Sequence, residues 1–391
     1  MVRHKRGRLL IIGPLPPPYA GPEIGTEIFV NSGTLRNAFD CRVINTTVRT
    51  SNSEKGKTDL TIVVAYVRYV WRLVSALLFF RPDTLIYRPT SATVKGWVRD
   101  GTTILFGSLA GCQVILQFGG GHFRFFYESL GRFGKTVIRR LLGNVAVVLA
   151  ESNGLRRQFA GLLPENRIGV LPTAVPDAFY AHFEKVHRVS RESPLIVLFV
   201  GHLSQAKGYC DLLKVIAFLA GKYDVKFHFM GARVSGERNI FFNQLTQERI
   251  RPEDPDECFA RYITAQGIKD RVVFLGDQVA GVDKLAAFER ASIFALPSYS
   301  EGFSRATLEA MAAGLPLVVT RVGAVPDIVD DGVNGFVVDP GDVAQLQAGL
   351  DKLLGDPALR AKMSAANRKR CEEEFLAECV SSRLVETIRS V

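Results

Sequence analysis

The sequence predicts an α/β fold with two doubly wound parallel-sheet domains, and three observations support this prediction. The chain has 391 residues, which at about 150 residues per domain suggests two domains. Short β-branched and aromatic runs alternate with helix-length amphipathic segments, as in βαβ units. Many of the short runs are almost continuously apolar, as expected for strands that are buried on both faces of a sheet.

Twelve short runs are the candidate strands, and they fall into two sets of six. The first set comprises residues 8–12, 42–45, 84–88, 113–118, 145–150 and 168–171. The second set comprises residues 195–200, 226–230, 272–275, 293–296, 317–320 and 336–338. Because doubly wound sheets bind ligands at the carboxyl ends of their strands, we expect the two domains to face each other across a ligand-binding cleft.

The expected domain boundaries follow from these two sets. We place one Rossmann-like domain over residues 1–185 and a second over residues 190–370, joined by the polar stretch 182–194. Residues 371–391 are interpreted as a C-terminal helix that can cross back to the first domain. Residues 231–270 form a longer connection than a usual crossover, and we interpret them as a lid, an oligomer contact or a surface excursion.

The six cysteines exclude two classes of site. They form no CxxC pair, and no histidine lies at a metal-ligand spacing from any of them, so zinc ribbons and redox motifs are not expected. We therefore expect reduced cysteines in a cytoplasmic protein. The start of the chain does not match a secretory signal, because its apolar run over residues 9–12 is too short.

One segment, residues 60–80, is apolar enough to be considered as a membrane span. It carries Arg68 and Arg72 in its interior, at i and i+4 on one helical face. Two arginines in the middle of a span would be costly to insert into a bilayer. We therefore interpret this segment as a long soluble helix with one edge in water.

The charge is distributed unevenly along the chain. The net charge is +10, but residues 1–190 carry +13 and residues 191–391 carry −3. A basic first half indicates an anionic partner or, alternatively, only a solvated basic surface. Nucleic acid is not favoured, because the sequence contains no RNP1 pattern, zinc finger or basic helix followed by heptads. This half also holds a basic group and an aromatic group: Arg132, Lys135, Arg139, Arg140, Phe123, Phe125, Phe126 and Tyr127.

The strongest local motif lies after the candidate strand 293–296. Glu301 lies in the following loop, Ser304 is a good N-cap for the next helix, and Glu309 lies about one and a half turns into that helix. A helix N-terminus suits a phosphate group, and carboxylates suit the hydroxyl groups of sugars. The alternative is a capped helix with two surface glutamates.

A second motif follows the candidate strand 317–320, where the turn Asp331-Gly-Val-Asn-Gly335 occurs. Together the two motifs resemble the carboxy-terminal domain of retaining nucleotide-sugar glycosyltransferases of family 4, which have the GT-B fold. That family carries two glutamates separated by seven residues, then a Gly-Pro turn and a DGxNG turn. Here Glu301 and Glu309 have this spacing.

The resemblance extends upstream to Gly201-His-Leu-Ser-Gln-Ala-Lys207-Gly208. In the family this segment reads G-R-L-x-x-x-K-G, and its arginine and lysine hold the donor diphosphate. Lys207 matches the lysine, whereas His202 replaces the arginine. The alternative for Lys207 is an i,i+4 surface pair with Asp211.

The first half of the chain resembles the family more loosely. Gly21 matches one glycine of the family's first loop, but Pro22 replaces the second and has no N–H group to offer a phosphate. His122 is the candidate for a family histidine that touches the donor sugar. The resemblance is strong over residues 195–375 and loose over residues 8–190.

The resemblance implies a retaining, metal-independent hexosyltransferase that uses a nucleoside diphosphate sugar and no cofactor. Lys207, His202 and the backbone near Ser304 would stabilise the leaving diphosphate. Glu309 would hold the ribose, and Glu301 the sugar. The implied catalytic residues are Lys207, Glu301 and His122, and the implied donor-binding residues are Gly21, Gly201, His202, Lys207, Val279, Glu301, Gly302, Phe303, Ser304 and Glu309.

The resemblance also implies where the acceptor binds. The first domain would hold the acceptor, and its basic, aromatic character suits a lipid-linked saccharide of bacterial cell-surface polysaccharide synthesis. We expect a cytoplasmic protein on the inner face of the cytoplasmic membrane, bound to an anionic lipid surface and not to nucleic acid. The alternatives are a non-catalytic GT-B paralogue and another GT-B enzyme, such as a sugar-nucleotide epimerase.

Overall fold

The chain divides into two compact units. The computed structural model describes residues 6–17, 19, 21–47, 60–89, 93–121, 123–184, 194–233, 241–250, 253–277 and 282–391. The first unit comprises Met1–Ala174 and Ala377–Val391, and the second comprises Val175–Leu376. Most of the linker expected at residues 182–194 lies outside the described residues.

The first unit is built on a six-stranded parallel sheet with the order β2-β1-β3-β4-β5-β6. The strands are β1 (Gly7–Gly13), β2 (Phe39–Asn45), β3 (Thr84–Tyr87), β4 (Gln113–Phe118), β5 (Val147–Ala150) and β6 (Ile168–Val170). All residues of β3 and β5 are buried, as their continuous apolar sequences predict.

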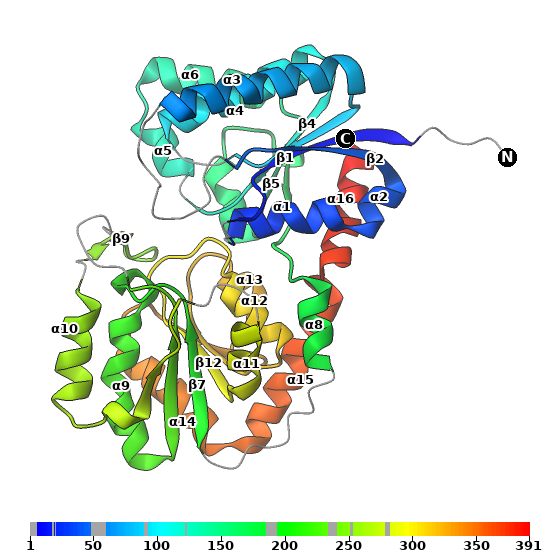
Figure 1. Ribbon diagram of the computed structural model, residues 1–391. Helices are drawn as coiled ribbons and strands as arrows, with labels where there is room; N and C mark the ends of the chain where they lie inside the picture. Colours follow the sequence, from blue (N-terminus) through cyan, green and yellow to red (C-terminus); the bar gives the residue numbers. More distant parts are fainter. Residues whose placement is uncertain are drawn as a thin grey trace. The chain divides into compact units, whose positions relative to one another are not determined.

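Helices cover both faces of this first sheet (Figure 1). One layer contains α3 (Leu60–Ser75) with a π-helical turn (Ala76–Phe80), α4 (Val94–Leu109), α5 (Phe123–Ser129) and α6 (Arg132–Gly143). The opposite face carries α1 (Gly21–Asn31), α2 (Gly33–Ala38) and the C-terminal helix α16 (Ala377–Ser390). The short helix α7 (Asn153–Arg156) connects β5 and β6.

The C-terminal helix α16 is fixed to the first unit by one carboxylate. Glu378 accepts hydrogen bonds from the backbone N–H groups of Gly33 and Thr34, at 2.9 and 3.0 Å, and from Ser32 Oγ at 3.0 Å. A negative charge at the start of α2 also suits the positive end of that helix. The end of the chain thus belongs to the same compact unit as its beginning.

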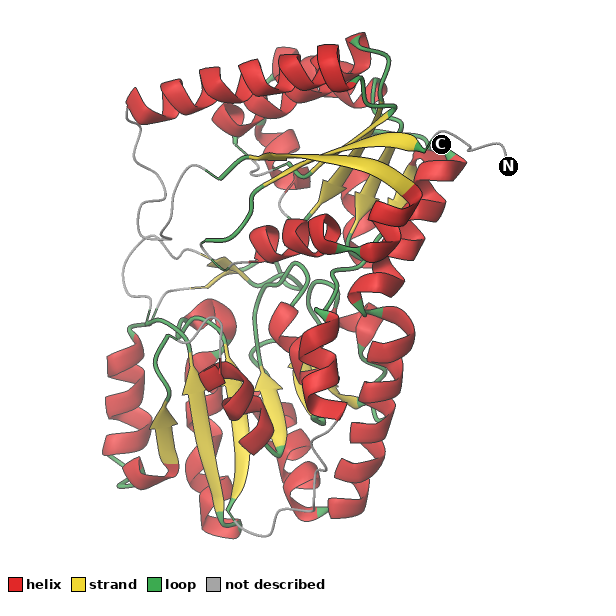
Figure 2. Cartoon of the chain, turned by 45° about the vertical axis from the view of Figure 1, so that its right-hand side comes forward, coloured by secondary structure: helices red, strands yellow, loops and turns green. Residues whose placement is uncertain are grey.

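The second unit contains another six-stranded parallel sheet, with the order β11-β8-β7-β12-β13-β14 (Figure 2). Its strands are β7 (Leu195–Val200), β8 (Val225–Met230), β11 (Val272–Phe274), β12 (Ile293–Leu296), β13 (Leu317–Thr320) and β14 (Gly335–Val338). Its helices are α8 (Asp177–Glu184), α9 (Tyr209–Lys222), α10 (Pro255–Phe259), α11 (Val282–Arg290), α12 (Arg305–Ala312), α13 (Val325–Ile328), α14 (Val343–Gly355) and α15 (Pro357–Glu374).

All twelve expected strands occur where the sequence places them, so the predicted fold class of two parallel α/β sheets is confirmed. The long connection after β8 holds more structure than expected. It contains a two-stranded antiparallel ribbon, β9 (Phe241–Phe242) with β10 (Arg249–Ile250), and then α10.

The expectation of six reduced cysteines is wrong for one pair. Cys210 in α9 and Cys258 in α10 form a disulfide, and both residues are buried. Their 48-residue separation carries no sequence signal, because the contact arises only when α10 packs against α9. The cysteines outside this disulfide are Cys41, Cys112, Cys371 and Cys379.

Most of the aromatic group noted in the first half of the sequence is buried. Phe123, Phe126 and Tyr127 are buried in the core between the sheet and its helices, and of this group only Phe125 is exposed. Within the described residues, one helical stretch, Val63–Phe80, is long and apolar enough to cross a membrane by length and composition. Arg68 and Arg72 of this stretch are both exposed.

Candidate active site

The strand order of the second sheet reverses between β7 and β12, and this reversal positions the candidate site. From β7 the sheet extends through β8 to β11, and from β12 it extends in the opposite direction through β13 to β14. The loops that follow β7 and β12 therefore leave the same edge of the sheet as neighbours. In open α/β sheets this is the usual place for a ligand.

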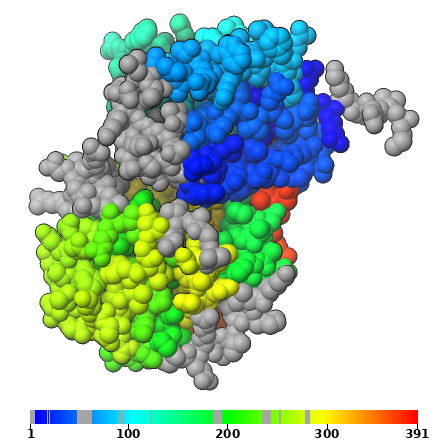
Figure 3. All heavy atoms as spheres, in the orientation of Figure 1, coloured from blue at the N-terminus to red at the C-terminus, as the bar shows by residue number. Residues whose placement is uncertain are grey.

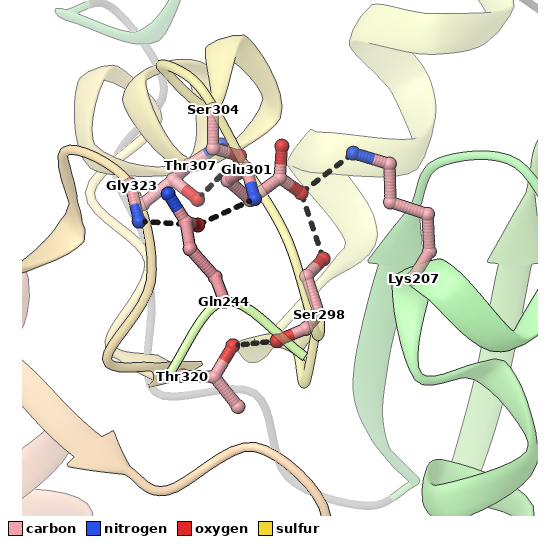
Figure 4. A network of polar contacts seen from close by, with 8 residues as sticks. All are labelled: Lys207, Gln244, Ser298, Glu301, Ser304, Thr307, Thr320 and Gly323. Atoms are coloured by element: carbon pink, nitrogen blue, oxygen red, sulfur yellow. Dashed lines mark hydrogen bonds and ion pairs between the residues drawn. The ribbon is translucent and has the colours of Figure 1, made fainter. Parts of the chain in front are cut away.

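Lys207, from the loop after β7, forms an ion pair with Glu301, from the loop after β12. Lys207 Nζ lies 2.7 Å from Glu301 Oε1, and Ser298 Oγ donates a hydrogen bond to the same oxygen at 2.7 Å (Figure 4). The Glu301 side chain is buried, whereas Lys207 is partly exposed. An ammonium group has three N–H donors, so Lys207 can hold Glu301 and still donate to a ligand.

Asp211 is not the partner of Lys207, so the alternative i,i+4 pair is wrong. Lys214 Nζ donates to Asp211 Oδ1 at 2.7 Å, and the Tyr299 hydroxyl donates to Asp211 Oδ2 at 2.6 Å. Burial and the charge of Asp211 raise the pKa of Tyr299, so this hydroxyl remains a donor. Asp211 thus fixes the loop after β12 to α9 and leaves Lys207 directed at Glu301.

Gln244, which the sequence did not indicate, braces the loops of the site. Its Oε1 accepts hydrogen bonds from the backbone N–H groups of Glu301, at 3.2 Å, and Gly323, at 3.0 Å (Figure 4). Gly323 has φ +57°, and a Cβ there would lie 2.3 Å from the carbonyl oxygen of Gly302. Gln244 belongs to the long connection after β8, so this connection contributes directly to the site.

Helix α12 begins beside Glu301 and presents its N-terminus to the same edge. Ser304 is its N-cap, as predicted, and accepts hydrogen bonds from the backbone N–H and the hydroxyl of Thr307. Glu309 is not a surface residue. Its Oε1 lies 2.7 Å from Lys284 Nζ of α11, and the two side chains are only 7% and 12% exposed.

The buried pair of Glu309 and Lys284 was not predicted. It depends on the packing of α11 against the strands beside α12, for which a single lysine in an amphipathic helix gives no signal. Only Oε1 of Glu309 lies beside Lys284, so its other carboxylate oxygen can accept hydrogen bonds from hydroxyl groups. The edge of this sheet therefore combines two carboxylates, an ammonium group and a helix N-terminus.

The remaining predicted donor-binding residues occupy several places. Gly201 and the exposed His202 directly follow β7. Gly302 and Phe303 lie between Glu301 and the start of α12, with the Phe303 ring 6.3 Å from the ring of Phe375. Gly21 begins α1 in the first unit. His122 and Val279 lie outside the described residues.

The first unit contains a second polar group that the sequence analysis missed. Arg88, directly after β3, lies with Nη2 2.6 Å from Glu151 Oε1, directly after β5, and both side chains are buried. Glu151 also accepts hydrogen bonds from Thr173 Oγ1 at 2.9 Å and from Gly120 N at 3.2 Å. A Cβ at Gly25 would lie 2.2 Å from Arg88 Nη1. Gly25 therefore makes room for a buried ion pair.

Within the described ranges, one group of residues of metal-ligating types lies close together. Cys210, Glu253 and Cys258 place one ligand atom each within 4.8 Å of one another. The two sulfur atoms are bonded to each other as a disulfide, and a metal ligand has to be a free thiolate. In this form the group does not suit a metal ion.

The family comparison decides the identity of the second unit. Residues 182–370 match the family model described as glycosyl transferases group 1. This match spans 189 of the 391 residues and shows that the second unit is similar to glycosyltransferases. The family match covers the second unit almost completely, including Lys207, Glu301 and Glu309, and confirms the resemblance to glycosyltransferases.

Curated proteins that are similar to this chain have several specificities. It is 33% identical, over 39% of its length, to an MMP alpha-(1->4)-mannosyltransferase of Mycolicibacterium hassiacum, of which the match covers 36%. It is 26% identical, over 51% of its length, to the capsular polysaccharide biosynthesis glycosyltransferase CapM of Staphylococcus aureus, of which the match covers 47%. The chain thus spans less than half the length of these two relatives.

Solved structures resemble the whole fold. The Anabaena protein Alr3699/HepE, solved in complex with UDP, superposes with a TM-score of 0.69 at 17% identity, covering 98% of this chain and 100% of that one. The lipopolysaccharide outer core galactosyltransferase WaaB superposes with a TM-score of 0.64, also at 17% identity, covering 98% of this chain and 99% of that one. Both likenesses concern the fold.

Proposed function

We propose that this protein transfers a hexosyl group from a nucleoside diphosphate sugar to an acceptor hydroxyl, with retention of anomeric configuration, as a family 4 glycosyltransferase. The proposal rests on the ion pair between Lys207 and Glu301. This pair lies beside the N-terminus of α12, at the strand-order reversal of the second sheet. The UDP bound to the structural neighbour HepE supports a nucleotide-sugar donor.

The chemistry required of the site is stabilisation of a leaving group. The bond between the anomeric carbon and the β-phosphate oxygen breaks, and its electron pair stays on the nucleoside diphosphate. A bond from the acceptor oxygen to the anomeric carbon forms on the same face, and the donor phosphate takes the acceptor proton. The Lys207 ammonium group and the N–H groups at the start of α12 are placed to stabilise the negative charge that develops.

The two carboxylates have separate roles in this proposal. Glu309, held in place by Lys284, accepts hydrogen bonds from the ribose hydroxyl groups. Glu301, with the backbone of Gly302 and Phe303, accepts hydrogen bonds from the hydroxyl groups of the transferred sugar. Gly21, Gly201 and His202 contribute to the diphosphate site, His122 to the sugar site and Val279 to the base site, all by analogy with the family.

We further propose that transfer needs no metal ion or cofactor. Lys207 and the helix N-terminus supply the positive charge that a divalent cation supplies in other transferases. Treatment with EDTA is expected to leave the initial rate of transfer nearly unchanged. A large loss of rate that Mg²⁺ or Mn²⁺ restores would contradict this part of the proposal.

The acceptor that we propose is a lipid-linked saccharide of bacterial cell-surface polysaccharide synthesis, bound by the first unit at the cytoplasmic face of the membrane. The names of two relatives support this class: CapM is a capsular polysaccharide enzyme and WaaB acts on lipopolysaccharide. The net charge of +13 in residues 1–190 suits an anionic lipid surface and a diphosphate-linked lipid.

A thermal-shift panel tests the donor part of the proposal. The wild-type protein is heated with UDP-, GDP- and ADP-sugars, each at a concentration far above the expected dissociation constant. We expect at least one donor class to raise Tm, since a ligand that binds only the folded state stabilises it. The Glu309→Ala variant should lose this shift. Failure of every nucleotide sugar to raise Tm would favour a non-catalytic paralogue.

A further inference from the structure

The helices α3, α4 and α6 form one layer over a face of the first sheet. Their inner side chains, among them Tyr69, Leu73 and Ile104, belong to the core cluster that includes sheet residues Leu85 and Leu116. Tyr66 Oη lies 2.7 Å from Thr102 Oγ1, which joins α3 to α4. This layer is therefore an integral part of the folded unit.

The outer face of the same layer is apolar and exposed. Nineteen large apolar side chains are exposed among the described residues, and twelve of them lie in α3 with its π-helical turn, α4 and α6. On α3 the stripe runs through Val63, Val67 and Trp71 at i, i+4 and i+8. A soluble surface rarely gathers so many apolar side chains without a partner. Figure 3 shows this layer in light blue and cyan at the edge of the first unit.

The charges on this layer indicate what kind of partner it binds. The sequences of α3 with its turn, α4 and α6 contain eight lysines and arginines and a single acidic residue, Asp100. Asp100 is buried toward the sheet. The exposed Arg68 and Arg72 lie on α3 directly beside the stripe that contains Trp71. Apart from the buried Asp100, the charged residues of these three helices are therefore all basic, and beside them Glu128 of α5 pairs with Lys135 of α6 at 2.8 Å.

From this pattern we propose that the outer face of α3, α4 and α6 is a docking surface for an anionic lipid bilayer, with α3 lying in the plane of the interface. Trp71, Phe79 and Phe133 are 71%, 81% and 84% exposed and serve as the inserted side chains. Helices with such apolar and basic faces bind at the boundary between headgroups and acyl chains. The packed inner face of α3 requires that the helix lies on the bilayer and does not span it.

This inference deepens the membrane part of the proposed function and rests on it. It is tested with vesicles of phosphatidylglycerol and phosphatidylcholine, compared with vesicles of phosphatidylcholine alone. No sugar nucleotide is present, so failure here leaves the proposed glycosyl transfer unaffected. The protein should sediment with the anionic vesicles. Raising the salt should weaken this binding, because exposed charges are screened.

Intrinsic fluorescence reports the orientation directly, because the chain has only two tryptophans. Trp71 is exposed, whereas Trp97 is 6% exposed within the core. The emission of the wild-type protein should shift to shorter wavelength when anionic vesicles are added. In Trp71→Phe the remaining emission, from Trp97, should not change on addition of the same vesicles. A shift that persists in Trp71→Phe, or no shift in the wild type, would overturn the proposal.

Charged substitutions test which side chains insert. The double variant Trp71→Glu with Phe79→Glu should bind anionic vesicles at least about tenfold more weakly than the wild type. The matched control is Phe218→Glu, since Phe218 is 52% exposed on α9 of the second unit. This control should bind as the wild type does. Equal binding by all three proteins, or no binding of the wild type to either vesicle type, would overturn the proposal.

Discussion

Glu301 is held from two sides in the second unit, by the ammonium group of Lys207 and by the hydroxyl of Ser298. This arrangement fixes the position of Lys207 before a donor binds. A fixed positive charge costs no reorganisation when the phosphate leaves, which is why such groups contribute strongly to transition-state stabilisation. The catalytic contribution of Lys207 is therefore the first quantity to measure.

We predict that Lys207→Ala lowers kcat/KM for the preferred donor about a hundredfold, a loss of roughly 3 kcal/mol in transition-state stabilisation. The measurement is initial-rate release of nucleoside diphosphate. The matched control is Lys222→Ala on α9, since the contacts of Lys222 are an exposed pair with Asp351 and the ring of Tyr223. Equal rates for the two variants would remove Lys207 from the site.

Asp100 determines a pH dependence of the first unit. Burial raises the pKa of Asp100 from its ordinary value to about 7, although Arg99 acts in the opposite direction and Tyr87 donates a hydrogen bond to the carboxyl group. The folded unit therefore binds a proton that the unfolded chain releases near pH 4. The stability that this proton provides is fully present below about pH 4 and is lost as the pH rises through about 7.

We predict that Asp100→Asn removes this pH dependence, because an amide cannot ionise. Between pH 5 and pH 8 the free energy of unfolding of the wild type should fall by roughly 1–3 kcal/mol relative to the variant. This free energy is measured by urea unfolding, with tryptophan emission as the signal, since both tryptophans lie in the first unit. Parallel pH profiles for the two proteins would show that Asp100 is ionised throughout.

At the scale of elements, the disulfide joins α9 to α10 in the second unit. Helix α9 begins two residues after Lys207, and α10 follows the connection that carries Gln244. The bond closes a loop of 48 residues, for which the chain-entropy model gives roughly 4 kcal/mol of stabilisation. It thus ties together two segments that border the candidate site.

We predict that the purified protein, unfolded without a reducing agent, exposes four reactive thiols and that reduction raises the number to six. The free thiols are those of Cys41, Cys112, Cys371 and Cys379. Thiol titration in denaturant measures the count. Cys41→Ser is the matched control and should lower both counts by one, whereas Cys258→Ser, which releases Cys210, should give five thiols both before and after reduction. Six thiols before reduction would show that the bond does not form.

The elements differ in how far the sequence could predict them. Strands such as β12 and β13 are buried on both faces, so their uninterrupted apolar sequences identify them. The two-residue strands β9 and β10 leave no such pattern, and so the role of Gln244 was not visible. Glu301, Ser304 and Glu309 were visible because they share one short segment. Their partners Ser298 and Lys284 depend on how separate elements pack.

At the scale of the whole molecule, both sheets reverse their strand order, between β1 and β3 in the first unit and between β7 and β12 in the second. Each sheet carries a polar pair at the carboxyl ends of its strands: Arg88 after β3 with Glu151 after β5 in the first unit, and Lys207 with Glu301 at the reversal in the second. The pair in the second unit is the one that the proposed function assigns to the donor.

The central claim, retaining transfer from a nucleoside diphosphate sugar, is tested most directly by the NMR spectrum of the product. The donor that raises Tm is incubated with the protein and a lipid-linked saccharide acceptor, and the anomeric coupling constant of the newly formed glycoside is measured. The account predicts a glycoside with the anomeric configuration of the donor. A glycoside of the opposite configuration, or an unchanged acceptor with every donor class, would contradict it.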